Sequence, residues 1–366
     1  MQTLKQRLDD IRTTYPLDTI GSMEEILFID IETTGFSATS SYLYMIGCLY
    51  YENHSFHVIQ WFADTYEEEE QILNSFFRFS QPYRYLIHYN GAQFDLPYIM
   101  KKVEKKHLPY TFDAFESIDV YKRIAPYKQL LSLENLKQKS IETFLSLKRE
   151  DLYNGGQLIS IYHDYVKSPT EYNRELLLLH NFEDVKGMLQ ILPILSYYDL
   201  FNAGITCEHA EINFYEDVYG KSQKELLLTC TSSHALPVGF SYSKNDCRIM
   251  AEGTEVKLRV PLVHAELKYF LPNYKEYYYL PLEDTAIHKS VAAYVDHAHR
   301  IPATLATCYT KKEGDFLPQW NACFSPEFKP EYRNRSSYFL YEDAFLTDQE
   351  MLDRYSNELL QMFAQK

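Results

Sequence analysis

The chain has 366 residues, of which 46% are hydrophobic and 24% charged, and its formal net charge is −15. This balance is typical of a globular protein with room for two domains, and the negative charge argues against tight, non-selective binding of a polyanion. The six cysteines form no Cys-x-x-Cys pair, which argues against a zinc site or a disulfide framework and favours a reducing cytoplasm.

The N-terminal segment carries Leu4, Leu8, Ile11 and Tyr15 at helical spacing. We therefore expect an amphipathic helix packed on the protein body. The segment lacks the apolar stretch of a signal peptide, and no apolar run in the chain approaches membrane-spanning length. These features predict a cytoplasmic protein that does not bind a membrane.

Residues 27–36 read as a buried strand followed by a Thr-Thr-Gly turn. Asp30 and Glu32 are two positions apart, so both side chains lie on one face of this strand. Neighbouring carboxylates repel each other, and a divalent cation between them relieves the repulsion. The alternative is a strand end at which both acids point into water.

Two further strands, residues 41–51 and 54–62, follow as an antiparallel meander, and then a helix at 67–79 and a short strand at 85–89. Asp95 comes next, where a loop turns into a helix, and it is either a helix cap or a ligand. The basic residues of this helix form either a solvated face or a phosphate track; they are Lys101, Lys102, Lys105 and Lys106.

The rest of the first half is predicted to be mainly helical. Residues 119–147 read as a moderately basic helix, 149–156 as a loop, and 157–166 and 170–195 as helices. His180 and Asp184 are four apart, so they share one helix face, whereas Leu177, Val185 and Met188 can be buried on another. Alone, a His–Asp pair on a helix is more often a salt link than a catalytic pair.

Three of these stretches together resemble the motifs of the DEDD superfamily of 3′→5′ exonucleases, which have the ribonuclease-H-like fold. The first motif, Asp-x-Glu in a strand, is similar to residues 30–35, Asp-Ile-Glu-Thr-Thr-Gly. The second, an Asn followed by an aromatic-Asp pair, is similar to residues 90–95, and with Pro97 and Tyr98 it resembles the proofreading domain of family B DNA polymerases. The third is similar to His180 and Asp184.

The chain also resembles the predicted ribonuclease-H-like exonucleases of bacteria that lack a polymerase domain, through the Gly155-Gly156 loop and Asn181. It departs from the superfamily in one respect. The family's Tyr branch has the aromatic residue four positions before the last Asp and its His branch has the His five before, whereas His180 stands at the Tyr spacing.

The resemblance implies a two-metal hydrolysis of phosphodiester bonds, for which two divalent cations, Mg²⁺ or Mn²⁺, activate water and stabilise the leaving oxygen. Asp30 would bridge both cations, and Glu32, Asp95 and Asp184 would complete their oxygen ligands. His180 would orient or deprotonate the water. The residues expected near the 3′-terminal nucleotide are Thr33, Thr34, Asn90 and Phe94.

The second half changes character from about Cys207 onward. Strands are expected at residues 226–231, 239–242, 256–260 and 277–280, a helix near 287–295, and a last helix opened by a capping box at 347–350. Its many tyrosines are interpreted as sheet residues, with base stacking as the alternative. His297 and His299 are interpreted as structural, because no third metal ligand accompanies them.

The predicted architecture is therefore α/β. A ribonuclease-H-like mixed sheet flanked by helices occupies residues 1–204, and a smaller α+β domain of unassigned role occupies 205–366. The expected function is a metal-dependent 3′→5′ exonuclease acting on a single-stranded 3′ end of DNA or RNA. The alternative is a nucleic-acid-binding or scaffold protein that keeps the fold with weak or absent cleavage.

Overall fold

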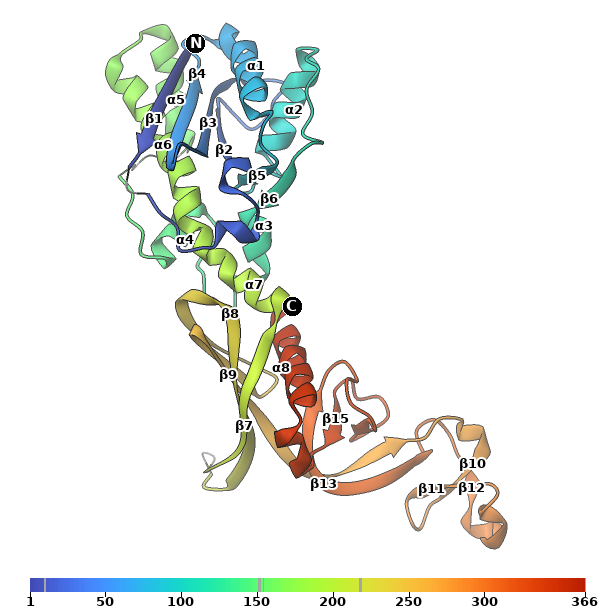
Figure 1. The fold of residues 1–366 in the computed structure, drawn as a ribbon. Helices are drawn as coiled ribbons and strands as arrows, with labels where there is room; N and C mark the ends of the chain where they lie inside the picture. The colour runs from blue at the N-terminus through green and yellow to red at the C-terminus, as the bar shows by residue number, and fades with distance from the viewer. Residues whose placement is uncertain (10, 151–152, 154, 217–218, 366) are drawn as a thin grey trace. The chain divides into compact units, whose positions relative to one another are not determined.

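The protein is described by a computed structural model that covers every residue except 10, 151–152, 154, 217–218 and 366. The chain divides into two compact units, Met1–Tyr198 and Asp199–Lys366. Figure 1 shows the elements of each unit. Among the described residues, no helix combines the length and the apolar character needed to cross a membrane. All six cysteines carry free thiols.

The first unit is built on a six-stranded mixed sheet with the order β1-β4-β3-β2-β5-β6. β2 pairs parallel with β5, and β5 with β6, whereas the other neighbours are antiparallel. The strands are β1 (Gln2–Leu8), β2 (Ile26–Thr33), β3 (Leu43–Glu52), β4 (Ser55–Phe62), β5 (Tyr85–His88) and β6 (Glu116–Asp119).

Helices cover both faces of this sheet. Successive residues of β4 point to opposite faces: the ring of Trp61 lies 6.3 Å from that of Phe76 on α1, whereas Gln60 donates a hydrogen bond of 2.9 Å to Asn181 on α6. The predicted mixed sheet flanked by helices is thus confirmed. The helices are α1 (Glu69–Ser80), α2 (Asp95–Lys105), α3 (Val120–Ile124), α4 (Gln138–Phe144), α5 (Gly155–Lys167), α6 (Glu171–Ile191) and α7 (Leu195–Ala203).

The prediction of an N-terminal amphipathic helix is wrong. Residues Gln2–Leu8 form β1, an edge strand that pairs antiparallel with β4 in a register that joins Gln2 to Phe62 and Leu8 to Phe56. Pairing satisfies the backbone groups that β4 would otherwise expose along its edge. Helical periodicity does not predict this pairing, because the pattern is read from the segment alone, without its partner strand.

The predicted long helix at 119–147 is also wrong, because two short helices replace it. Asp119 ends β6 and caps α3, accepting a hydrogen bond of 3.2 Å from the backbone N–H of Lys122. Pro126, which has no N–H to donate, and Ser132, whose φ is 53°, follow before α4 begins. Gly155 and Gly156, expected in a loop, open α5; the rest of that predicted loop is only partly described.

The second unit contains two sheets. The larger has the order β13-β15-β14-β9-β8-β7 and the smaller the order β11-β10-β12. The expected helix near 287–295 is wrong, because its first residues pair with β10 as β11. The strands are β7 (Ile205–Glu216), β8 (Ser222–Lys244), β9 (Cys247–Phe270), β10 (Tyr277–Leu280), β11 (Thr285–His288), β12 (Ile301–Pro302), β13 (Tyr309–Gln319), β14 (Phe328–Lys329) and β15 (Ser337–Leu340).

The predicted C-terminal helix is confirmed as α8 (Gln349–Ala364). Its cap is Asp348, one residue after the Thr347 of the predicted capping box, and it accepts a hydrogen bond of 3.0 Å from the backbone N–H of Met351. Leu352, Leu359 and Phe363 of this helix are buried. His297 and His299 lie in a short 3-10 helix, His297–His299.

Candidate active site

Two carboxylates enter the site from β2. Asp30 lies opposite Gly47 and Glu32 opposite Met45 in the β2–β3 pairing, so both side chains point to the face that α6 covers. Glu32 is buried, and its Oε2 lies 3.5 Å from the Tyr44 hydroxyl. The alternative, in which both acids point into water at a strand end, does not hold for Glu32.

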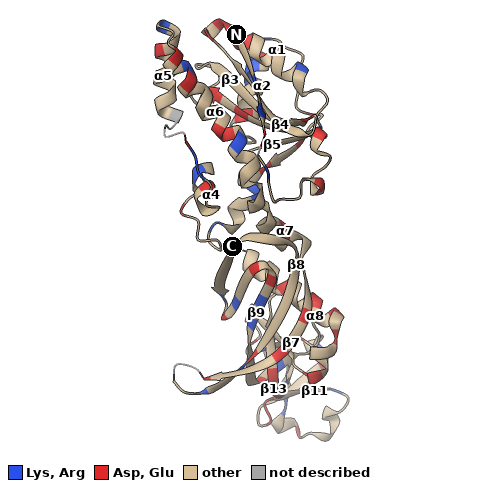
Figure 2. Cartoon of the chain, turned by 60° about the vertical axis from the view of Figure 1, so that its left-hand side comes forward, with Lys and Arg blue, Asp and Glu red and all other residues tan. Residues whose placement is uncertain are grey.

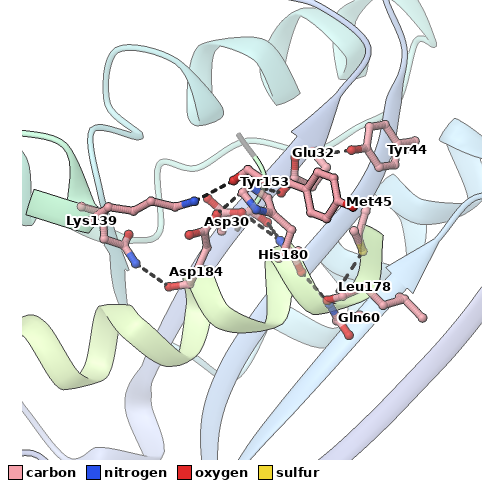
Figure 3. A network of polar contacts seen from close by, with 12 residues as sticks. Asp30, Glu32, Tyr44, Met45, Gln60, Lys139, Tyr153, Leu178, His180 and Asp184 are labelled. Atoms are coloured by element: carbon pink, nitrogen blue, oxygen red, sulfur yellow. Dashed lines mark hydrogen bonds and ion pairs between the residues drawn. The ribbon is translucent and has the colours of Figure 1, made fainter. Parts of the chain in front are cut away.

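Helix α6 brings His180 and Asp184 to this pair. His180 Nε2 lies 3.3 Å from Asp184 Oδ2 and 3.7 Å from Glu32 Oε1. Figure 3 shows His180 between the strand and the acid of its own helix. Potential ligand atoms of Glu32, His180 and Asp184 all lie within 4.8 Å of one another, the one such group found in the described part of the chain.

Asn181 fixes the position of Asp30. Its Nδ2 donates a hydrogen bond of 2.8 Å to Asp30 Oδ2, and its Oδ1 accepts one of 2.9 Å from Gln60. A Cβ at Gly47 would stand 1.9 Å from Asn181 Oδ1, so the glycine makes room for this side chain. In the sequence, Asn181 stood out only through the resemblance to the bacterial exonucleases; a glycine inside an otherwise apolar strand was the available signal of its contact with β3.

Burial and mutual repulsion act on Asp30. The pKa of its carboxyl is raised well above the ordinary value, first by burial and then by the charges of Asp184, Glu32 and Asp95. The hydrogen bond from Asn181 acts in the opposite direction. Asp30 is therefore within electrostatic reach of all three other predicted acids.

Asp95 is the first residue of α2 and is buried. Burial raises the pKa of its carboxyl to about 7, and hydrogen bonds from the backbone of Asp95 and of Ile31 oppose that rise. The contact with Ile31 locates the Asp95 carboxylate beside β2, between Asp30 and Glu32 along the chain. Asp95 is therefore not the cap of α2, because the preceding residue, Phe94, occupies the cap position.

Two residues from the segment between β6 and α5 also contact Asp184. Arg149 Nη1 lies 2.7 Å from Asp184 Oδ1 and 3.3 Å from Oε1 of buried Glu142. Gln138 Nε2 donates a hydrogen bond of 3.0 Å to the backbone oxygen of Asp184. The sequence analysis identified neither residue, because nothing local connects them to α6.

The four residues expected near a 3′ terminus border the acids in sequence. Thr33 ends β2, and the Thr34 hydroxyl accepts a hydrogen bond of 2.8 Å from the backbone of Tyr42. Asn90 has a φ of 61°, and its backbone N–H donates a hydrogen bond of 3.0 Å to Asp119 Oδ1. The Phe94 ring lies 6.0 Å from that of Phe36, which is 91% exposed.

The lysines of α2 do not form one exposed row. Lys102 is buried, and its Nζ lies 2.7 Å from Glu69 Oε1. Lys101 and Lys105 are exposed, and Lys105 Nζ donates a hydrogen bond of 3.3 Å to the backbone oxygen of Thr39. Lys102 is therefore a structural ion-pair residue and not part of a phosphate track.

The donor set fits a hard divalent cation. Carboxylate oxygens are the ligands that Mg²⁺ and Mn²⁺ prefer. Ligand atoms about 2.1 Å from one Mg²⁺ are at most about 4.2 Å apart, so the carboxylates of Glu32 and Asp184, within 4.8 Å, need only small adjustments. Asp30 supplies a further carboxylate beside this group.

The first unit contains a region similar to a known family. A family model described as the RNase_H superfamily matches residues 27–196. The family B DNA polymerase of the hyperthermophilic archaeon Pyrobaculum calidifontis is similar, at 13% identity and a TM-score of 0.40. The match covers 48% of this chain and 25% of the polymerase chain. No curated protein matched the sequence.

Two structures of Escherichia coli exonuclease I are similar as well. The zinc-bound complex with single-stranded DNA has a TM-score of 0.29 and the complex with a dT13 oligonucleotide one of 0.28. In both, identity is 10%, and the match covers 57% of this chain and 55% of the exonuclease. The chain thus spans about half the length of exonuclease I and a quarter of the polymerase.

Proposed function

Because residues 27–196 form a domain of the RNase H superfamily, whose fold is that of a nuclease, we propose that the chain is a metal-dependent 3′→5′ exonuclease. The observation that carries the proposal is the convergence of Glu32, His180 and Asp184 within 4.8 Å, with Asp30 and Asp95 in electrostatic contact with the same centre. Two of these acids, Glu32 and Asp95, are buried, and cations at the site would compensate the charge of the group.

The ligands would be Asp30, Glu32, Asp95 and Asp184, with Mg²⁺ or Mn²⁺ as the cations. When bound, the two cations supply an activated water and stabilise the leaving oxygen. His180, held between Glu32 and Asp184, would accept the proton of the attacking water through Nε2.

The remaining roles rest on the similarity of residues 30–35, 90–95 and 180–184 to the exonuclease motifs. That similarity supports the 3′→5′ polarity and a single-stranded 3′ end of DNA or RNA as substrate. Thr33, Thr34, Asn90 and Phe94 would contact the terminal nucleotide. The exposed Phe36 beside Phe94 widens the apolar surface at this point.

A second candidate function is nucleic-acid binding without cleavage. The observation that favours it is the ion pair between Arg149 and Asp184, since a guanidinium already compensates one of the acids. In this case the fold would serve as a scaffold, and divalent cations would not stabilise the protein.

The deciding experiment is degradation of 5′-labelled single-stranded DNA and RNA with Mn²⁺, beside Asp30→Asn. The exonuclease gives a ladder that shortens from the 3′ end, which EDTA and the variant abolish. A phosphorothioate at the last linkage should slow the reaction, whereas cleavage inside a strand blocked in this way would indicate an endonuclease. Retained binding without cleavage would support the second candidate.

A further inference from the structure

One surface pocket, of about 530 Å³, combines aromatic rings, exposed lysines and amide groups. We name it the α3–α4 pocket; it lies within the first unit. Its lining includes Tyr89, Asn90, Tyr121, Lys128, Lys137 and Gln138. Its size lies in the range of small-molecule sites, so it can take up one nucleotide.

Two rings form an aromatic wall of the pocket. The rings of Tyr89 and Tyr121 lie 6.1 Å apart at 83° to each other, so the two offer differently oriented faces. The Tyr89 hydroxyl donates a hydrogen bond of 2.8 Å to the backbone oxygen of Leu136, which fixes this ring. Aromatic rings bind unpaired bases by stacking, whatever the base.

Two lysines supply positive charge at the same pocket. Lys128 and Lys137 are exposed, and neither makes an ion pair in the part of the chain that the structure describes. They belong to a basic segment, residues 120–140, which has five Lys or Arg and one Glu in a chain of net charge −15. Figure 2 shows blue positions at α4. Unpaired lysines beside rings match the backbone phosphates of a strand.

The pocket also has an unused hydrogen-bond acceptor. Asn90 Oδ1 is buried, and no described residue donates a hydrogen bond to it. The backbone N–H of Asn90 donates a hydrogen bond of 3.0 Å to Asp119 Oδ1, which fixes the backbone at this residue. A buried acceptor of this kind is best satisfied by a donor on a ligand, such as a base amino group or a sugar hydroxyl.

Two lining residues connect the pocket to the candidate active site. Asn90 precedes Asp95 in the loop that leads into α2, and Gln138 donates a hydrogen bond of 3.0 Å to the backbone of Asp184. The pocket therefore borders the acids. An exonuclease that removes the 3′ nucleotide has the rest of its strand on the 5′ side of the cut bond, where such a pocket would be used.

We propose that the α3–α4 pocket binds a nucleotide of a single strand on the 5′ side of the bond that is cut. Tyr89 and Tyr121 pack against its base, and Lys128 and Lys137 contact the flanking phosphates. The direction in which the strand binds is taken from the proposed function, and this part of the proposal rests on it. It makes this pocket, which shares Asn90 with the terminal-nucleotide site, the source of preference for longer single strands.

Binding is measured by fluorescence anisotropy in EDTA, with 5′-fluorescein-labelled DNA and RNA octamers and the variant Lys128→Gln/Lys137→Gln. We expect affinity for the octamers to fall about tenfold or more, and the slope of log K against log salt to fall by about 1.4, since two phosphate contacts are lost. The matched control is Lys5→Gln/Lys167→Gln, which removes the same charge from exposed positions of the first unit.

Competition against the labelled octamers measures the affinity for thymidine 5′-monophosphate. This affinity should be unchanged in the double lysine variant. The proposal is overturned if this variant binds the octamers as the control does, or if its affinity for the mononucleotide falls as much as that for the octamers. Tyr121→Ala gives a second, charge-neutral test, with an expected loss of about 5- to 100-fold in octamer affinity.

A cleavage assay separates failure of the pocket from failure of the proposed function. The p-nitrophenyl ester of thymidine 5′-monophosphate has a leaving group but no 5′ strand, so the double lysine variant should hydrolyse it with unchanged kcat/KM. Its kcat/KM on the octamers should fall about tenfold, through KM. If the wild type cleaves neither substrate, the proposed function fails, and the anisotropy results alone support or overturn the pocket.

Discussion

Arg149 and Asp184 form an ion pair of 2.7 Å between the segment before α5 and helix α6. The Arg149 side chain is 10% exposed, and it also reaches Glu142, which is buried. One cation thus compensates two acids, one of which belongs to the proposed metal site. Arg149 therefore links two quantities, the unfolding free energy of the metal-free protein and the affinity of the site for metal.

Replacing Arg149 should change stability and metal response in opposite directions. Arg149→Met leaves Glu142 and Asp184 without their cation, so the metal-free protein should lose about 3 kcal/mol of unfolding free energy. The Tm increase produced by Mn²⁺ should become larger, because Asp184 no longer has a competing partner. Differential scanning fluorimetry with EDTA and with Mn²⁺ measures both effects.

Arg174→Met is the matched control for this variant, because Arg174 pairs with the exposed Glu171 on the same helix. An exposed pair of this kind contributes less than about 1 kcal/mol. A Mn²⁺-induced shift in Arg149→Met no larger than that of the wild type would show that Arg149 and the metal do not compete.

The raised pKa of Asp95 predicts that the unfolding free energy of the protein depends on pH. The pKa of its carboxyl is raised to about 7 in the folded protein, against about 3.9 in an unfolded chain. The folded state therefore binds the proton more tightly, so stability from this group is complete below about pH 4 and is lost as the pH rises towards 7. Metal-free protein should thus be less stable at pH 8 than at pH 5.

Asp95→Asn removes the ionisation, so in EDTA it should be more stable than the wild type at pH 8, by up to about 4 kcal/mol. The difference should shrink towards pH 4, and Mn²⁺ should stabilise the variant less than the wild type. Urea unfolding at pH 5 and 8 measures this, with Asp164→Asn, an exposed site on α5, as control. Equal stability of Asp95→Asn and wild type at pH 8 would contradict the prediction.

Asn181 should act on metal affinity through Asp30. Asn181→Leu removes the 2.8 Å hydrogen bond to Asp30 Oδ2 and leaves that carboxylate free to turn. Loss of a partner that orients a metal ligand typically reduces affinity by about 10- to 100-fold. Isothermal titration with Mn²⁺ measures the change.

Gly47→Ala should resemble Asn181→Leu, because its new Cβ would stand 1.9 Å from Asn181 Oδ1. Glu175→Gln, at an exposed position of α6, is the control and should titrate as the wild type does. If both variants kept wild-type affinity, Asp30 would not be a ligand that Asn181 orients.

Lys102 should matter for folding and not for nucleic-acid binding. Lys102→Met leaves Glu69 buried without its cation and should cost about 3–5 kcal/mol of unfolding free energy. Lys101→Met, one residue earlier and exposed, should stay within about 0.5 kcal/mol of the wild type. Urea unfolding compares the two.

The salt dependence of octamer binding supplies the second measurement on Lys102→Met. We expect the slope of log K against log salt to equal that of the wild type, because the buried ammonium contacts no phosphate. A slope reduced by about 0.7 would instead indicate one lost phosphate contact and restore Lys102 to the binding surface.

Local rules were sufficient for the parts of the site that lie close together in sequence. The alternation of strand side chains placed Asp30 and Glu32 on one face, and the helical repeat placed His180 over Asp184. The start of α2 at Asp95 followed from the same kind of rule. These periods are properties of the backbone, so a sequence specifies them without knowledge of the fold.

Only the tertiary structure decided the relationships between distant segments. Asn181 is 151 positions from Asp30, and no periodicity links Arg149 to Asp184. Residues 2–8 have a helical pattern of apolar side chains, yet they form β1 because β4 offers an unpaired edge. Burial likewise determined the pKa of Asp95 and the ion pair of Lys102, since desolvation depends on what the rest of the chain packs around a charge.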